Sequence, residues 1–70
     1  MPTDGAILRN AAKALNFACY ELDNACESLQ EGCELLSDTP EGDKVKSLLD
    51  ELETVLKDVK RMRKEWGQAE

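Results

Sequence analysis

The chain has 70 residues, enough for one small domain (residues 1–70), and carries 15 acidic and nine basic side chains for a net charge of −6. With one Phe, one Tyr, one Trp, two prolines and four glycines, its composition is typical of long helices and excludes a β-sheet domain or a disordered tail. No apolar run approaches the roughly 20 residues of a membrane span, and the first ten residues lack the pattern of a secretory signal. We therefore expect a cytoplasmic protein with reduced thiols.

The first predicted helix covers about residues 5–36. Thr3 or Asp4 can cap it, because either side chain can accept a backbone N–H of the first turn. No proline follows until Pro40. At 1.5 Å per residue this helix is about 48 Å long.

The second predicted helix covers about residues 40–66, after a turn at residues 37–39. Thr39 is a suitable N-cap, and Pro40 suits the first helical position. Gly67 can end the helix in the left-handed conformation. The connection is so short that the two helices must lie antiparallel.

Small residues and leucines repeat every seven positions in the first helix. In coiled-coil letters the d positions are all leucine and the a and g positions are all small, so a neighbouring helix can approach closely. The a series is Gly5, Ala12, Cys19, Cys26 and Cys33; the d series is Leu8, Leu15, Leu22, Leu29 and Leu36; the g series is Ala11, Ala18, Ala25 and Gly32.

The second helix carries a complementary and bulkier stripe. Large side chains opposite small ones build an interdigitated core. The predicted a positions are Val45, Leu52, Val59 and Trp66, the d positions are Leu48, Val55 and Met62, and Leu49 and Leu56 widen the stripe at e.

These patterns predict an all-α protein, an antiparallel helical hairpin that dimerises into a four-helix bundle. Ordering the chain costs on the order of 100 kcal/mol, at roughly 1.5 kcal/mol per residue, and one apolar stripe per helix barely balances that cost. We expect a second copy to supply the rest. The predicted oligomer core consists of Leu15, Cys19, Leu22, Cys26, Leu29 and Cys33.

The cysteines are predicted to be small core residues, because free cysteine packs like a small hydrophobe. Successive sulfurs lie about 10 Å apart along the helix axis. Two thiolates on one zinc ion are at most ~4.6 Å apart, so we predict no metal site and no cofactor. An antiparallel dimer centred on Cys26 would bring thiols of the two subunits together, which leaves a redox role as an alternative.

Charge is distributed unevenly along the chain. Residues 21–53 hold 11 acids and two bases, whereas the two outer segments hold seven bases and four acids. A hairpin brings the outer segments together, so its turn end is acidic and its open end is basic. The basic end complements the dipole of the second helix, lies beside the acidic end of a second hairpin in an antiparallel assembly, or forms an anion site. Its cations, with Trp66 beside them, are Arg9, Lys13, Lys57, Lys60, Arg61, Arg63 and Lys64.

Apolar residues also lie outside the heptad face, at Ile7, Ala14, Phe17 and Tyr20. A helix with two apolar faces is usually buried on both. This second face is therefore either buried in the oligomer or docks a partner. Phe17 and Tyr20 are the predicted interface residues.

Enzymatic activity is not expected. The chain has no histidine and no Gly-rich phosphate loop, and none of Ser28, Ser37 and Ser47 has a neighbour suited to act as its general base. A two-helix hairpin offers no enclosed pocket that would strongly perturb pKa values.

The predicted architecture resembles that of the Rop-type plasmid regulators, in which a short hairpin with small and leucine layers dimerises into an antiparallel four-helix bundle. The RNA-binding face that this resemblance implies has no counterpart here, because residues 21–35 carry only acidic charges. The segment "TPEGDKVKSLLDELE" is similar to the turn and second helix of small phage hairpin proteins that sequester cyclic nucleotides. The matching residues are Pro40, Gly42, Leu49, Leu52 and Glu53.

From these features we predict a non-catalytic interaction protein, such as a phage accessory protein, that self-associates and binds a macromolecular partner as an inhibitor or adaptor. The alternative is an oligomer that sequesters a small anion or nucleotide. We expect no membrane association and no broad DNA binding, since duplex DNA would be repelled by most of this acidic surface. The predicted partner-binding residues are Phe17, Tyr20, Arg61, Arg63, Lys64 and Trp66.

Overall fold

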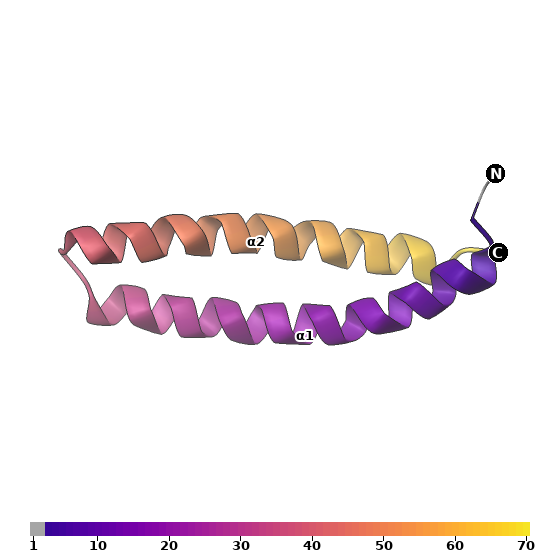
Figure 1. The fold of residues 1–70 in the computed structure, drawn as a ribbon, viewed down its shortest axis with the longest axis horizontal. Coiled ribbons are helices and arrows are strands. Elements are labelled where there is room, and N and C mark those ends of the chain that lie inside the picture. The colour runs from indigo at the N-terminus through magenta and orange to yellow at the C-terminus, as the bar shows by residue number, and fades with distance from the viewer. Residues whose placement is uncertain (1–2) are drawn as a thin grey trace.

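The computed structural model describes residues 3–70, so the first two residues of the predicted domain lie outside it. The chain forms two long helices, α1 (Gly5–Leu35) and α2 (Pro40–Gly67), which pack antiparallel and measure 50 × 19 × 13 Å (Figure 1). The described chain ends lie together at the end opposite the turn. This confirms the predicted all-α hairpin, with helix bounds within one residue of those expected. Neither helix in residues 3–70 is long and apolar enough to cross a membrane.

The start of α1 and the turn are fixed by side-chain caps. The Asp4 carboxylate accepts a hydrogen bond from the Ala6 N–H at 2.8 Å. At the turn, Asp38 takes the left-handed conformation with φ 64°. Thr39 then caps α2, because its hydroxyl accepts from the Gly42 N–H at 3.0 Å and donates to the Leu36 carbonyl at 2.6 Å. One threonine side chain therefore ties the end of α1 to the start of α2.

The predicted ending of α2 at a left-handed Gly67 is wrong. No described glycine has a positive φ, and α2 continues through Gly67 to a C-cap at Gln68. The Gln68 N–H donates to the Glu65 carbonyl at 3.3 Å, and the Ala69 N–H donates to the Trp66 carbonyl at 3.2 Å. Because these tight-turn bonds satisfy the last carbonyls, a left-handed residue is not required.

The seam between the helices uses the three series expected for α1 and most of the stripe expected for α2, whose a series is half-buried along its whole length. Every position of the a, d and g series of α1 is buried or half-buried. In α2, Leu49 and Leu56 are each only 8% exposed, whereas Leu48 is 55% and Val55 is 48% exposed. The prediction that Leu48 and Val55 are buried in the seam is therefore wrong.

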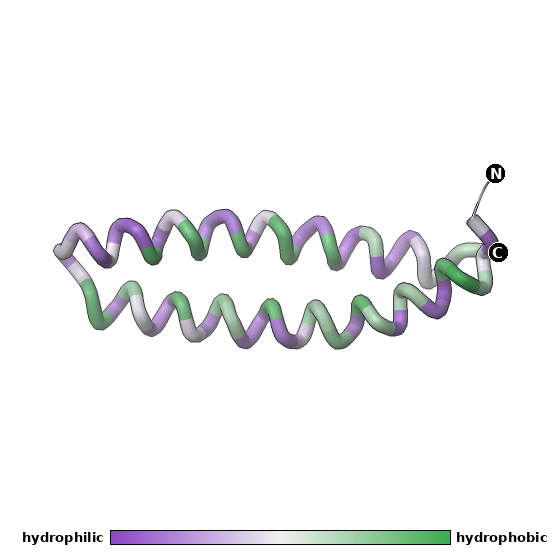
Figure 2. Tube along the Cα trace, viewed as in Figure 1, coloured by the Kyte–Doolittle hydropathy of each residue, from purple (hydrophilic) through white to green (hydrophobic). Residues whose placement is uncertain are grey.

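This difference has a steric reason. The small residues of α1 let α2 approach so closely that one α2 series, Gly42, Leu49 and Leu56, packs directly against α1 and is buried. Leu48 and Val55 precede Leu49 and Leu56 by one residue, so they lie about 100° around the helix, at one edge of the seam. Figure 2 shows hydrophobic positions recurring on the inner side of both helices.

The residues of the predicted oligomer core all lie along this seam within one hairpin. Cys19 is buried, and Leu15, Leu22, Cys26, Leu29 and Cys33 are half-buried. All three cysteines are free thiols. Their role as small packing residues is consistent with this placement.

Candidate binding surfaces at the open end

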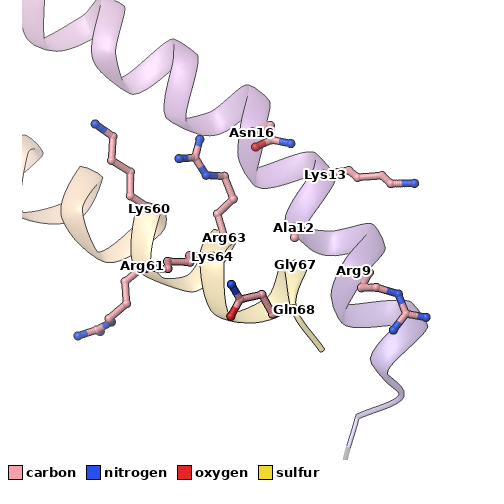
Figure 3. Close-up of a pocket in the computed structure, with 10 residues that line it drawn as sticks. All are labelled: Arg9, Ala12, Lys13, Asn16, Lys60, Arg61, Arg63, Lys64, Gly67 and Gln68. Atoms are coloured by element: carbon pink, nitrogen blue, oxygen red, sulfur yellow. The ribbon is translucent and has the colours of Figure 1, made fainter. Parts of the chain in front are cut away.

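A cationic groove of about 860 Å³ crosses the open end of the hairpin. Both helices contribute to it, and Figure 3 shows side chains from α1 and α2 around it. No acidic residue belongs to its lining. The lining residues are Arg9, Ala12, Lys13, Asn16, Lys60, Arg61, Arg63, Lys64, Gly67 and Gln68.

Arg63 has a special position in this groove. It continues the seven-residue series of Gly42, Leu49 and Leu56, which forms the buried side of α2, and it is half-buried where the other five cations are exposed. Figure 3 shows its side chain extending from α2 toward α1, near Asn16. A charged group therefore occupies a seam position that a large apolar side chain holds elsewhere along the helix.

The cations of the groove are only partly neutralised by carboxylates. Within residues 3–70, ion pairs join Lys60 to Asp23 at 3.8 Å and Arg61 to Asp58 at 3.7 Å. Arg9 is held differently, since its guanidinium donates a hydrogen bond to the Ala69 carbonyl near the end of α2.

Several groove cations are also close neighbours of one another in sequence. Arg9 and Lys13 are four residues apart, as are Lys60 and Lys64, so each pair lies on one helix face. Like-charge pairs at this spacing destabilise a helix by about 0.2–0.5 kcal/mol each. The groove thus carries repulsion between like charges, which the Lys60–Asp23 ion pair offsets only in part and a bound anion would reduce further.

Phe17 and Tyr20 form a separate aromatic patch on the outer face of α1. They are 74% and 70% exposed, and they lie one helical turn apart on the side of α1 that faces away from α2. The second apolar face at these two residues is therefore not covered within the hairpin. Ile7 is also exposed, but it lies further toward the N-terminus.

A third apolar surface lies along one edge of the seam. The ion pair of Lys60 with Asp23 marks the opposite, polar edge. Helix periodicity places Leu48 and Val55 on the edge away from this pair, together with the small g series of α1, Ala11, Ala18, Ala25 and Gly32. We call this surface the alanine edge.

Cys26 faces the polar edge of the seam. Burial, together with the nearby carboxylates of Glu53 and Asp23, raises the pKa of the Cys26 thiol, and Lys60 opposes that shift. The neutral thiol is therefore favoured at neutral pH, and the neutral thiol is the less reactive form. This environment suits a packing residue better than a redox-active one.

The structure divides the predicted partner-binding residues between two surfaces. Phe17 and Tyr20 lie on the outer face of α1, whereas Arg61, Arg63 and Lys64 line the groove, and Arg61 points away from α1 (Figure 3). Trp66 is half-buried and does not line the groove.

The groove also contains residues that are not among the predicted partner-binding residues. Arg9, Lys13 and Lys60 belong to the predicted basic end, but the polar side chains of Asn16 and Gln68 were not expected there. The heptad pattern could have indicated Asn16, since it flanks the small a series of α1. No sequence signal points to Gln68, because it follows the last helical residue.

Residues 3–70 contain no group of three or more Cys, Asp or Glu side chains arranged to hold a metal ion.

No protein-family model, curated protein or solved structure matches the chain.

Proposed function

We propose that this protein is a non-catalytic interaction protein that self-associates and binds a macromolecular partner as an inhibitor or adaptor. The observation that carries the proposal is the exposure of Phe17 and Tyr20 on a regular, well-capped helix. Full burial of a Phe-sized side chain is worth about 1.5–3 kcal/mol. Two adjacent exposed aromatic residues are therefore a suitable anchor for a partner, since aromatic residues are enriched at interface centres.

Self-association is supported by the incomplete core of the single hairpin. No large side chain among residues 3–70 is fully buried, and the alanine edge leaves Leu48 and Val55 about half exposed. A second hairpin packed on this edge would complete a four-helix bundle. An antiparallel arrangement would also set the basic open end of each subunit beside the acidic turn end of the other.

The two functions use different surfaces in this proposal. The alanine edge lies beside the seam, whereas Phe17 and Tyr20 lie on the back of α1. A dimer built on the alanine edge would keep both aromatic patches on its outside. Each dimer would then offer two equivalent partner sites, and bivalent binding raises avidity when both sites can be engaged at once.

Partner binding is tested by the double variant Phe17→Asp, Tyr20→Asp in a quantitative affinity purification from the cells that make the protein. We expect the specific partner to be depleted at least about tenfold, which corresponds to a loss of about 1.4 kcal/mol or more. Both residues are exposed, so the melting temperature should change little.

The matched control is the double variant Leu48→Asp, Val55→Asp, which places the same two charges on the alanine edge. We expect this control to retain the partner. Its binding should weaken only to the extent that the loss of the dimer removes bivalent binding. Equal recovery of every bound protein by wild type and the Phe17/Tyr20 variant would contradict the proposed partner site.

A further inference from the structure

We infer that the cationic groove is a binding site for a small multivalent phosphate anion, with Arg63 as its central ligand. This inference goes beyond the proposed function, because it concerns a different surface and a different class of ligand. The site would recognise a chain of linked phosphates, as in inorganic triphosphate or the triphosphate group of a nucleotide. Such a chain carries several adjacent negative charges, and Arg and Lys donors suit phosphate oxygens.

The position of Arg63 carries most of the argument. A charge that is partly removed from water is costly unless a group of opposite charge compensates it. Within residues 3–70 no carboxylate forms an ion pair with Arg63, since the two ion pairs present involve Lys60 and Arg61. A leucine at this position would extend the buried series of Leu49 and Leu56. An anionic ligand gives a physical reason for an arginine here.

The surroundings of Arg63 match this ligand. Lys64 lines the groove without an ion pair in the described chain, and so does Lys13 on α1, whose side chain points away from α2 in Figure 3 and would have to turn toward a bound ligand. Ala12 contributes only a methyl group and Gly67 has no side chain, so both positions leave room for a ligand near the backbone. The amides of Asn16 and Gln68 supply further hydrogen-bond donors. No acidic residue lines the groove, and the carboxylates nearest its cations, those of Asp23 and Asp58, pair with Lys60 and Arg61 and leave Arg63 free for phosphate.

Size and long-range charge favour a small ligand over a polymer. The groove volume of about 860 Å³ falls within the range of roughly 300–1,000 Å³ that is usual for small-molecule sites. Beyond the open end, residues 21–53 hold 11 acids and two bases. A long nucleic acid would run along this acidic surface and be repelled, whereas a short phosphate chain contacts only the basic end.

The inference predicts opposite effects of one substitution on binding and on stability. Arg63→Leu should lower the affinity for triphosphate at least about tenfold, because the central donor is lost. The same change should raise the melting temperature of the ligand-free protein, because leucine completes the buried series of α2. If Arg63 served only to stabilise the fold, Arg63→Leu would instead lower the melting temperature of the ligand-free protein. Arg63→Gln keeps a polar side chain and tests the loss of charge alone.

The experiment is isothermal titration calorimetry of the full chain with sodium triphosphate and, separately, with ATP, at an ionic strength near 0.15 M. Lys57→Gln is the matched control, since Lys57 belongs to the basic end but does not line the groove. We expect saturable binding of triphosphate, a loss with Arg63→Leu and Arg63→Gln, and a change below about threefold with Lys57→Gln.

The two ligands distinguish the source of the phosphate chain. Equal affinities would assign recognition to the phosphates alone, and tighter ATP binding would add a contact to the nucleoside. Absence of binding of both ligands at millimolar concentration would overturn the inference. An equal loss with Lys57→Gln and Arg63→Leu would also overturn it, because it would indicate a diffuse charge effect and no site at the groove.

Discussion

Replacing Leu56 by alanine is expected to lower the free energy of unfolding by about 2–5 kcal/mol. Leu56 is 8% exposed and belongs to the α2 series that packs directly on α1. Domains of this length have a total stability of roughly 3.5–10 kcal/mol, at 0.05–0.15 kcal/mol per residue. The substitution should therefore remove a large part of that stability. Urea unfolding followed by circular dichroism measures the loss.

Leu35→Ala is the control for this prediction. Leu35 is 79% exposed and lies at the last position of α1, so the same chemical change should alter stability by no more than about 0.5 kcal/mol. If Leu56→Ala and Leu35→Ala were equally mild, Leu56 would not lie in the seam, and the packing described for α2 would be wrong.

Replacing Gly42 by alanine is expected to destabilise the hairpin by about 1–3 kcal/mol. Gly42 lies buried in the first turn of α2, and a Cβ atom at this position would overlap the carbonyl oxygen of Leu36. That oxygen is backbone and also accepts the Thr39 hydroxyl, so it cannot move without disturbing the cap. Thermal unfolding should show a drop of several degrees, because 1 kcal/mol corresponds to about 4–8 °C for a domain of this size.

Gly32→Ala is the matched control for Gly42→Ala. A Cβ atom at Gly32 would meet the nearest Val45 methyl at 3.7 Å, which is an ordinary packing distance. Alanine is favoured over glycine in a helix interior by about 0.8–1 kcal/mol, so this variant should be more stable than wild type. Destabilisation by Gly32→Ala together with tolerance of Gly42→Ala would contradict the described approach of the helices at the turn.

The hairpin could be predicted from the sequence because its signals are local. The cap and proline at Thr39 and Pro40 fix where α2 begins, and the heptad repeat fixes which face of α1 is buried. These features depend on residues within a few positions of one another. For the same reason, both helices begin at the predicted residue and each ends within one residue of the predicted end.

The exact seam of α2 could not be predicted in the same way. Its apolar stripe is three positions wide, and the heptad pattern alone does not say which two series face α1. That choice depends on how closely the small residues of α1 let α2 approach, which is a tertiary property. Leu48 and Val55 were expected in the seam and are instead exposed at its edge. Their exposure leaves an apolar surface beside the small residues of α1.

The candidate sites could likewise be predicted from the sequence only in part. The exposure of Phe17 and Tyr20 follows from their helical positions opposite the leucine series, and the basic end follows from charge along the chain. The groove itself requires both helices in register, since its lining residues Lys13 and Arg63 are 50 residues apart in sequence and lie on different helices. The half-buried position of Arg63 likewise depends on which α2 series faces α1.

The most direct test of self-association through the alanine edge is native mass spectrometry of the freshly purified protein and two variants. We predict a dimer of the 7.8 kDa chain for wild type and for Phe17→Asp, Tyr20→Asp, but a monomer for Leu48→Asp, Val55→Asp. Raising the salt concentration should weaken the wild-type dimer, because an antiparallel pair gains from opposite charges at its ends. A wild-type monomer at micromolar concentration, or a dimer that survives the two charges at Leu48 and Val55, would contradict this account.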